Sequence, residues 1–335
     1  MRSMILKDEA KRGVLFRSAS FERARGLSFE VRVPASTSNL GAGFDCFGLA
    51  LQLYLTVRAS VAPESENPCR IRFLKGEGQS LLPRTAENLI FRAMRLAAER
   101  LGQSLPPVRL AVHNEIPLGR GLGSSAAAIL AGVSLGGLLC GQELSDEETL
   151  HYATELEGHA DNIASALYGG WTIACNGFEG GVIVLKRRWP GEIKLIVISP
   201  EVALETELAR RILPPTVSRA DAVHNLQRAA LFTAAIEERA DHLLWEAMQD
   251  RLHQEERRRL VPGLAEALAT PRLPGLLGLA LSGAGPSVLA LALDHFDEIG
   301  ERVASRFRQY GIEATVRLLE VDDKGLRRAT MDAER

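Results

Sequence analysis

Residues 117–128 read PLGRGLGSSAAA and combine closely spaced glycines with a serine pair and the start of an alanine-rich run. Glycine reaches positive φ without a Cβ clash, so such a loop can aim several backbone N–H groups at one anion. The proline-free run 125–139 predicts a buried helix, with Ser124 and Ser125 as its N-terminal caps. The unpaired N–H groups and positive dipole end of that helix would face the loop. The segment therefore predicts a polyphosphate site.

This glycine loop matches neither of two common nucleotide-binding motifs. No Lys-Ser or Lys-Thr follows its glycines, as a Walker A motif requires, and they are spaced G-x-G-x-G rather than G-x-G-x-x-G. Taken alone, the segment is also consistent with a structural glycine turn capped by serine before a core helix.

Two further blocks of small residues favour the functional interpretation. Residues 31–51, VRVPASTSNLGAGFDCFGLAL, predict a strand, a turn that starts at Pro34, and a loop of small hydroxyl residues and glycines around an aspartate. Residues 279–291, LALSGAGPSVLAL, predict two apolar strands joined by a small-residue turn at 282–287. We expect the three small-residue loops to meet at one site.

These three blocks, in this order, resemble the GHMP family, which groups galacto-, homoserine, mevalonate and phosphomevalonate kinases. The middle block matches the phosphate loop of that family. Four local matches are most similar to its homoserine kinase subfamily: PASTSNLGAGFDCFGLAL at 34–51, EGHADNIASALYGG at 157–170, TELARRILP at 206–214 and LHQEERRRLVPG at 252–263. The last block departs from the HQPYR-like pattern of the subfamily, since Glu255 and Glu256 stand before Arg257.

The resemblance implies an α+β, two-domain GHMP kinase fold. Its N-terminal domain would be similar to the second domain of ribosomal protein S5, and its C-terminal domain would be ferredoxin-like. The length of 335 residues also predicts two packed domains around a cleft. We expect a flexible extension at 1–27, the ATP-binding domain at 28–192 and the C-terminal domain at 193–335.

Hydrophobic periodicity predicts an alternation of strands and helices along the chain. The expected strands are 28–33, 51–60, 108–112, 170–175, 181–185 and 195–199, and the expected helices are 88–101, 125–139 and 146–156. A helix-rich stretch at 222–248 precedes a strand, a helix and a strand over 278–319.

Composition excludes several classes of protein. The net charge of −2, from 40 basic and 42 acidic residues, does not predict a nucleic-acid partner. None of the four cysteines stands in C-x-x-C spacing. This pattern favours reduced thiols in a cytoplasmic protein. No apolar run reaches the roughly 18 residues that a membrane-spanning helix needs, so no membrane partner is expected.

The resemblance implies ATP-dependent phosphorylation of the side-chain hydroxyl of L-homoserine, on the route from aspartate to threonine. ATP and Mg²⁺ are the implied cofactors, L-homoserine is the small-molecule substrate, and a homodimer is left open. One alternative is a kinase of the same fold that acts on a mevalonate-like or sugar-like alcohol. Another is a non-catalytic sensor, which the intact glycine loop disfavours.

The resemblance assigns roles to particular residues. Ser125 and Glu157 would hold Mg²⁺ through hard oxygen ligands, although a helix cap and a surface carboxylate are the simpler interpretations. Asp161 is either the catalytic base or a helix N-cap. Homoserine kinases are thought to work without a protein base, with the counterpart of Asn162 binding the substrate hydroxyl and the γ-phosphate accepting the proton. The nucleotide-binding residues would be Pro117, Leu118, Gly119, Arg120, Gly121, Leu122, Gly123, Ser124, Ser125, Ala126 and Ala127.

The amino-acid end of the substrate needs groups of both charges. Arg210 and Arg257, in the two subfamily-like blocks, would bind the α-carboxylate through forked hydrogen bonds. Asp45 would bind the ammonium group, and Asn39 and Gly283 would lie close to the substrate. Because further arginines stand beside both chosen ones, a solvated basic face is the alternative for either cluster.

Overall fold

The computed structural model describes residues 27–62 and 65–332. The predicted extension at 1–27 therefore lies outside the described residues, except for Leu27, which begins the first strand. The strands are β1 (Leu27–Ser38), β2 (Phe47–Val61), β3 (Cys69–Gly76), β4 (Val108–Asn114), β5 (Trp171–Asn176), β6 (Val182–Arg187), β7 (Lys194–Pro200), β8 (Leu276–Leu281), β9 (Val288–Ala292), β10 (Ala314–Leu319) and β11 (Arg327–Asp332).

The helices lie between these strands along the chain. They are α2 (Leu89–Arg100), α3 (Ser124–Leu139), α4 (Asp146–Glu157), α5 (Asp161–Tyr168), α6 (Thr206–Arg211), α7 (Arg219–Glu238), the 3₁₀ turn η1 (Asp241–Leu243), α8 (Leu244–Ala247), α9 (Gln254–Arg257), α10 (Leu264–Leu268) and α11 (Phe296–Arg308). None of the helices in the described ranges is long and apolar enough to cross a membrane.

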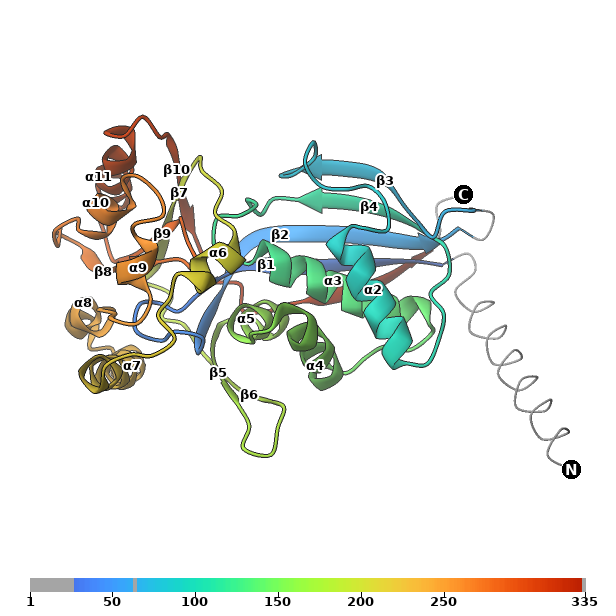
Figure 1. Ribbon diagram of the computed structural model, residues 1–335, viewed down its shortest axis with the longest axis horizontal. Helices are drawn as coiled ribbons and strands as arrows, with labels where there is room; N and C mark the ends of the chain where they lie inside the picture. The colour runs from blue at the N-terminus through green and yellow to red at the C-terminus, as the bar shows by residue number, and fades with distance from the viewer. Residues whose placement is uncertain (1–26, 63–64, 333–335) are drawn as a thin grey trace, which may run out of the picture.

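The strands form two sheets that lie at opposite ends of the long axis (Figure 1). The larger sheet has the order β11-β1-β2-β4-β3, and β5 and β6 extend it beside β2. Pairing is antiparallel except between β3 and β4, which run parallel. The smaller sheet has the antiparallel order β10-β7-β9-β8. The expected two-domain α+β fold is confirmed.

Helix α3 lies at the centre of the larger part of the molecule (Figure 1). It packs against β1, β2, α2, α4 and α5, and it is apolar around its whole circumference, as expected for a buried helix. Gly132 and Gly136 let α2 approach closely: a Cβ on Gly132 would lie 2.3 Å from the carbonyl oxygen of Ile90. The glycine loop is therefore fixed at the end of a rigid core helix.

A separate hydrophobic core supports the smaller sheet. Helix α11 packs on β7, β9 and β10, and α10 packs on α11 and β8. Ile299, Val303 and Phe307 recur at helical spacing along α11 and are fully buried against the sheet. This core holds β8 and β9 in place, and hence also the turn between them.

The structure corrects three features of the predicted pattern. Strand β1 does not end before Pro34 but continues to Ser38, with a register shift at Pro34 and Ala35. A bulge accommodates proline, which cannot donate to the ladder. Strands β3 and β11 were not predicted, and β11 pairs with β1. Residues 327–332 therefore belong to the larger sheet, although the predicted C-terminal domain ran to 335; the other domain boundaries stay predictions.

We predict that Gly132→Ala destabilises the fold by about 1–3 kcal/mol through overpacking against α2. Without a clash, replacing glycine by alanine in a helix interior would stabilise the fold by about 0.5–1 kcal/mol. A loss of stability therefore reports the clash with α2. Urea unfolding followed by circular dichroism measures it. Gly191→Ala is the matched control, because a Cβ there has no neighbour within 4 Å. Equal or greater stability of Gly132→Ala would contradict the close approach of α2 and α3.

Candidate active site

The glycine loop has the backbone geometry that its sequence suggested. Gly119, Gly121 and Gly123 have φ values of 62°, 71° and 68°. Gly123 is the N-cap of α3, and no side chain caps this helix. The prediction that Ser124 and Ser125 cap α3 is therefore wrong, since the left-handed glycine takes the capping position and both serines belong to the helix. Their hydroxyls are left for other partners.

The three small-residue loops meet, as predicted. The Ser36 N–H donates to the Leu122 carbonyl at 3.2 Å, which joins β1 to the glycine loop. The Ser282 hydroxyl donates to the Gly121 carbonyl at 2.7 Å and can accept from the Thr37 hydroxyl at 2.8 Å. A Cβ on Gly121 would lie 2.1 Å from the Ser282 carbonyl oxygen. The loops are in backbone contact, so glycine is required at this position.

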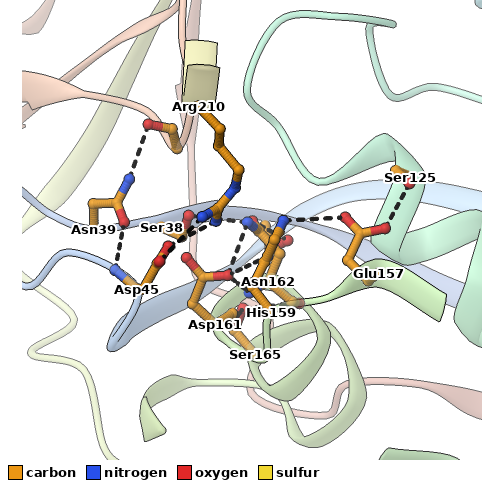
Figure 2. Close-up of polar contacts among 12 residues, drawn as sticks. Ser38, Asn39, Asp45, Ser125, Glu157, His159, Asp161, Asn162, Ser165 and Arg210 are labelled. Atoms are coloured by element: carbon orange, nitrogen blue, oxygen red, sulfur yellow. Dashed lines mark hydrogen bonds and ion pairs between the residues drawn. The ribbon is translucent and has the colours of Figure 1, made fainter. Parts of the chain in front are cut away.

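Ser125 and Glu157 form one side of the site. The Ser125 hydroxyl, at the start of α3, donates to Glu157 Oε2 at 2.7 Å (Figure 2). Glu157 ends α4, and Gly158 with φ 85° turns the chain away there. The interpretation of Glu157 as a surface carboxylate fails, because its side chain is only 11% exposed. Two hard oxygens thus lie together beside the glycine loop.

His159 and Asp161 contact each other beside these oxygens (Figure 2), and they form an ion pair when the imidazole is protonated. The Nδ1 atom of His159 lies 3.0 Å from Asp161 Oδ1, and its Nε2 lies 3.8 Å from Glu157 Oε1. Burial lowers the pKa of His159, but Asp161 outweighs it and the net pKa is raised. Burial would raise the pKa of Asp161, yet bonds from His159 and the Asn162 N–H hold it below its usual value. Asp161 is therefore a weak proton acceptor.

Asn162 is held with its amide in one orientation. Its Oδ1 accepts from the Ser36 hydroxyl at 2.9 Å, and its Nδ2 donates to the Ser38 hydroxyl at 2.9 Å. The Asn162 N–H also donates to Asp161 Oδ1 at 2.7 Å. The end of β1 and the start of α5 therefore fix this amide at the cavity wall, where Figure 2 shows it beside Asp161 and Ser38.

Arg210 and Asp45, which were assigned to the carboxylate and the ammonium group of the substrate, are paired with each other. The two terminal nitrogens of Arg210 donate to the two carboxylate oxygens of Asp45 at 2.7 and 3.1 Å (Figure 2). Asn39 holds the loop: its Oδ1 accepts from the Asp45 N–H at 3.0 Å, and its Nδ2 donates to the Gly283 carbonyl at 2.9 Å. Asn39 and Asp45 both have left-handed backbones, with φ 71° and 54°.

Arg257 is buried rather than part of a solvated face. It is 1% exposed, whereas the side chains of Arg258 and Arg259 are 39% and 63% exposed. Its Nε donates to the Ala209 carbonyl at 3.0 Å. No carboxylate within the described ranges lies within ion-pair distance of its guanidinium. Burial lowers its pKa to about 10, so it is still protonated at neutral pH. A buried cation without a counter-ion is suited to bind an anion.

These groups line one cavity of about 110 Å³. A second cavity of about 650 Å³ adjoins it and shares Ser125, Glu157, His159 and Arg210. Of the predicted residues, Leu118, Ala126 and Ala127 do not line the smaller cavity; both alanines are buried beneath the loop. The predicted residues that do line it are Asn39, Asp45, Pro117, Gly119, Arg120, Gly121, Leu122, Gly123, Ser124, Ser125, Glu157, Asp161, Asn162, Arg210, Arg257 and Gly283.

Sequence reasoning missed Ser38, His159, Thr206 and Ala284, which also line the cavity. His159 stands between Glu157 and Asp161 in the EGHADN block, so its position was a usable signal. Thr206 stands four residues before Arg210 on α6, a spacing that puts both on one helix face. Ser38 had no distinguishing feature within its run of hydroxyl residues.

Comparisons with known proteins agree with this geometry. Family models described as "GHMP kinases N terminal domain" and "GHMP kinases C terminal" match residues 88–170 and 227–309. The homoserine kinase of Desulfitobacterium hafniense is 40% identical over 88% of this chain and 98% of that protein. That of Deinococcus radiodurans is 44% identical over 78% of this chain and 83% of that protein.

Solved structures show the same fold. The crystal structure of homoserine kinase from Cytophaga hutchinsonii has a TM-score of 0.79 and 28% identity, and the match covers 90% of this chain and 97% of that one. A mevalonate diphosphate decarboxylase from Enterococcus faecalis shares the fold alone, with a TM-score of 0.65 at 13% identity over 91% of this chain and 99% of that one. The chain belongs to the GHMP kinase family, within its homoserine kinase branch.

We predict that His159→Gln costs more stability at pH 5.5 than at pH 8.5. Because the pKa of His159 is raised in the folded state, the stability from its charge is present below the unfolded value of 6.5. That stability is lost as pH rises through the folded-state pKa. Asp161, Glu157 and Arg210 are the charged groups that face it. Urea unfolding of wild type and variant at both pH values gives the two differences.

His113→Gln controls for the general loss of an imidazole. His113 is exposed on β4 and forms no ion pair with the residues that the structure describes. A stability cost of His159→Gln that is equal at both pH values, or larger at pH 8.5, would show that the ion pair with Asp161 does not act as a charge pair.

Proposed function

We propose that this chain transfers the γ-phosphoryl group of ATP to the side-chain hydroxyl of L-homoserine, forming ADP and O-phospho-L-homoserine for threonine biosynthesis. The observation that carries the proposal is the buried guanidinium of Arg257, which forms no ion pair with any described carboxylate, beside the Arg210–Asp45 pair in a cavity walled by the glycine loop. An amino-acid alcohol has one anionic group, one cationic group and one hydroxyl. The cavity offers a complement to each.

The charges of an α-amino acid match this end of the cavity. Arg257 and Arg210 would bind the carboxylate, each through charge-assisted bonds worth about 1.5–3 kcal/mol when shielded. Asp45 would bind the ammonium group. The Arg210–Asp45 pair is about one-third exposed, and partly exposed ion pairs add little stability. A zwitterion can therefore enter between the two side chains at small cost.

The glycine loop and the start of α3 would bind the phosphates of ATP. Backbone N–H groups and the positive end of the helix dipole favour a polyphosphate here. The adjacent oxygens of Ser125 and Glu157 suit Mg²⁺, which prefers a few hard protein oxygens together with phosphate oxygens and water. When bound there, Mg²⁺ would neutralise charge on the terminal phosphates and so lower the barrier to transfer.

Alignment, rather than a protein base, would drive the transfer. The hydroxyl oxygen of homoserine forms a bond to the γ-phosphorus as the bond to the β–γ bridging oxygen breaks, and the hydroxyl proton passes to the γ-phosphate. Asn162 would orient that hydroxyl. Support comes from Asp161, whose Oδ1 already accepts from His159 and the Asn162 N–H and whose pKa is lowered. We assign Asp161 to positioning of these two neighbours.

The alternatives predict other charges. A mevalonate-like acceptor carries a carboxylate but no ammonium group, and a sugar-like acceptor carries neither, so Asp45 would have no role beside the arginines. A sensor would not require Ser125 and Glu157 to face each other at the phosphate loop. The relatives at 40% and 44% identity, both described as homoserine kinases, also favour homoserine.

The test is a coupled ADP-release assay with Mg²⁺-ATP and L-homoserine, mevalonate, galactose or L-serine. Turnover confined to L-homoserine is expected. Turnover on mevalonate or galactose instead would keep the kinase assignment and overturn the substrate. Absence of turnover on all four would overturn the enzyme assignment.

We predict that Arg257→Ala raises the KM for homoserine about 10–100-fold, as loss of a charged hydrogen bond would. The KM for ATP should stay close to wild type, because Arg257 lies at the amino-acid end of the cavity. Initial rates with each substrate varied in turn measure both constants. Arg259→Ala, with an exposed arginine two residues away, is the matched control. Weakened ATP binding with unchanged homoserine KM would reverse the orientation that we propose.

We also predict that Gly121→Ala weakens ATP binding at least about tenfold, because the new Cβ must displace the Ser282 backbone. Isothermal titration with the nonhydrolysable analogue AMPPNP and Mg²⁺ measures it. Gly119→Ala is the control: its φ is also positive, but its Cβ would meet its nearest neighbour, the Ala203 side chain, only at 3.1 Å. If both variants bound equally well, contact between the two loops would not matter for the nucleotide.

A further inference from the structure

His253 is buried directly behind Arg257. It is the N-cap of α9, the short helix that carries Arg257, and it is 0% exposed. Its ring is stacked on Phe44 with 4.9 Å between centroids, and the guanidinium of Arg257 lies 5.3 Å from the same Phe44 ring. His253 was not among the predicted site residues, and it does not line the cavity.

The two ring nitrogens of His253 have different partners. Nε2 lies 3.0 Å from the Gly41 carbonyl oxygen, which can only accept. Nδ1 lies 3.2 Å from Arg257 Nη1, which can only donate. Both bonds exist together only if the ring carries its proton on Nε2 and is neutral. The hydrogen-bond partners therefore define one tautomer of His253.

A buried polar network fixes the position of the ring. Asp250 Oδ2 accepts from the backbone N–H groups of His253 and Gln254 at 2.9 and 2.8 Å. Asn225, on α7, donates to Asp250 Oδ1 at 2.7 Å and to the Ala42 carbonyl at 3.2 Å. The network joins α7 and α9 to the loop 39–46, which carries Asp45. The imidazole thus has little freedom to move away from Arg257.

The charges around the ring agree with a neutral form. Burial lowers the pKa of His253, and the attraction of Asp250, 3.7 Å from Nε2, does not reverse this. Arg257 lowers the pKa of His253 further, because it repels a second positive charge. Asp45 favours the charged form, but its effect is smaller. A charged imidazolium could not accept from Arg257, and it would add a cation beside an unpaired one.

We propose that His253 is a positioning residue that holds Arg257 in the substrate cavity by accepting its Nη1 hydrogen bond on Nδ1. The other contacts of Arg257 are to carbonyl oxygens: Ala209 accepts from Nε at 3.0 Å, and Gly283 accepts from the same Nη1 at 3.3 Å. His253 therefore supplies one of the two acceptors that fix that end of the guanidinium, and it is the one that a side-chain substitution can remove. This inference rests on the proposed role of Arg257 in binding the homoserine carboxylate.

Two variants separate this role from general support of the fold. In His253→Asn, the side-chain oxygen can take the place of Nδ1 and accept from Arg257, while the contact with Gly41 is lost. In His253→Gln, the amide nitrogen can take the place of Nε2 and donate to Gly41, while the acceptor for Arg257 is lost. Both variants lose the same stacking on Phe44, so each controls for the other.

We expect His253→Gln to raise the KM for homoserine about tenfold, the effect of one lost hydrogen bond to a charged group, and to leave the KM for ATP nearly unchanged. His253→Asn should keep a homoserine KM within about threefold of wild type. Steady-state kinetics and thermal unfolding of all three proteins provide the data. In the Arg257→Ala background, the difference between the two variants should vanish.

Three results would overturn the inference: an unchanged homoserine KM in His253→Gln, equal increases in both variants, or a difference that persists without Arg257. Equal loss of thermal stability with equal KM values would assign His253 to the fold alone. Failure of the proposed function is a separate outcome, because wild type would then not phosphorylate homoserine at all.

Discussion

The contact between the phosphate loop and the turn after β8 is the constraint on which the site depends. Gly121 and Ser282 come from loops more than 150 positions apart in the sequence and meet through backbone atoms, with the Ser282 hydroxyl on the Gly121 carbonyl. Because no side chain separates them, a shift of either loop would move the other. The backbone of the glycine loop, where we propose that the phosphates bind, is therefore positioned by the turn between β8 and β9 of the smaller sheet.

The electrostatics of the site centre on Arg257. Its guanidinium is buried, and its partners among the described residues are carbonyl groups, the face of Phe44 and a histidine rather than a carboxylate. Asp161 and Asp45 are paired instead with His159 and Arg210. Among the described residues, Arg257 thus has no carboxylate partner at the place where we propose that the substrate carboxylate binds.

Much of this could be predicted from local sequence, and the misses have physical causes. The glycine loop, α3 and the convergence of three small-residue blocks follow from backbone freedom and hydrophobic periodicity. Pairing of Asp45 with Arg210 could not be predicted, because the two lie in separate blocks and only the folded loops bring them together. Arg257 was chosen over Arg258 and Arg259 only through the resemblance, since the burial that sets it apart depends on the direction in which α9 packs. Strand β11 is polar and has no alternating pattern to mark it.

The pairing of β11 with β1 has a consequence for biosynthesis. The C-terminal half of β1 carries Ser36 and Ser38, which contact Asn162 in the site. The N-terminal half of β1 pairs with β11, which covers an edge of β1 that would otherwise be free. Residues 327–332 are synthesised after every other strand of both sheets. The larger sheet, although built mainly from the first half of the sequence, therefore keeps an open edge at β1 until these residues have emerged. That edge closes only when β11 pairs with β1.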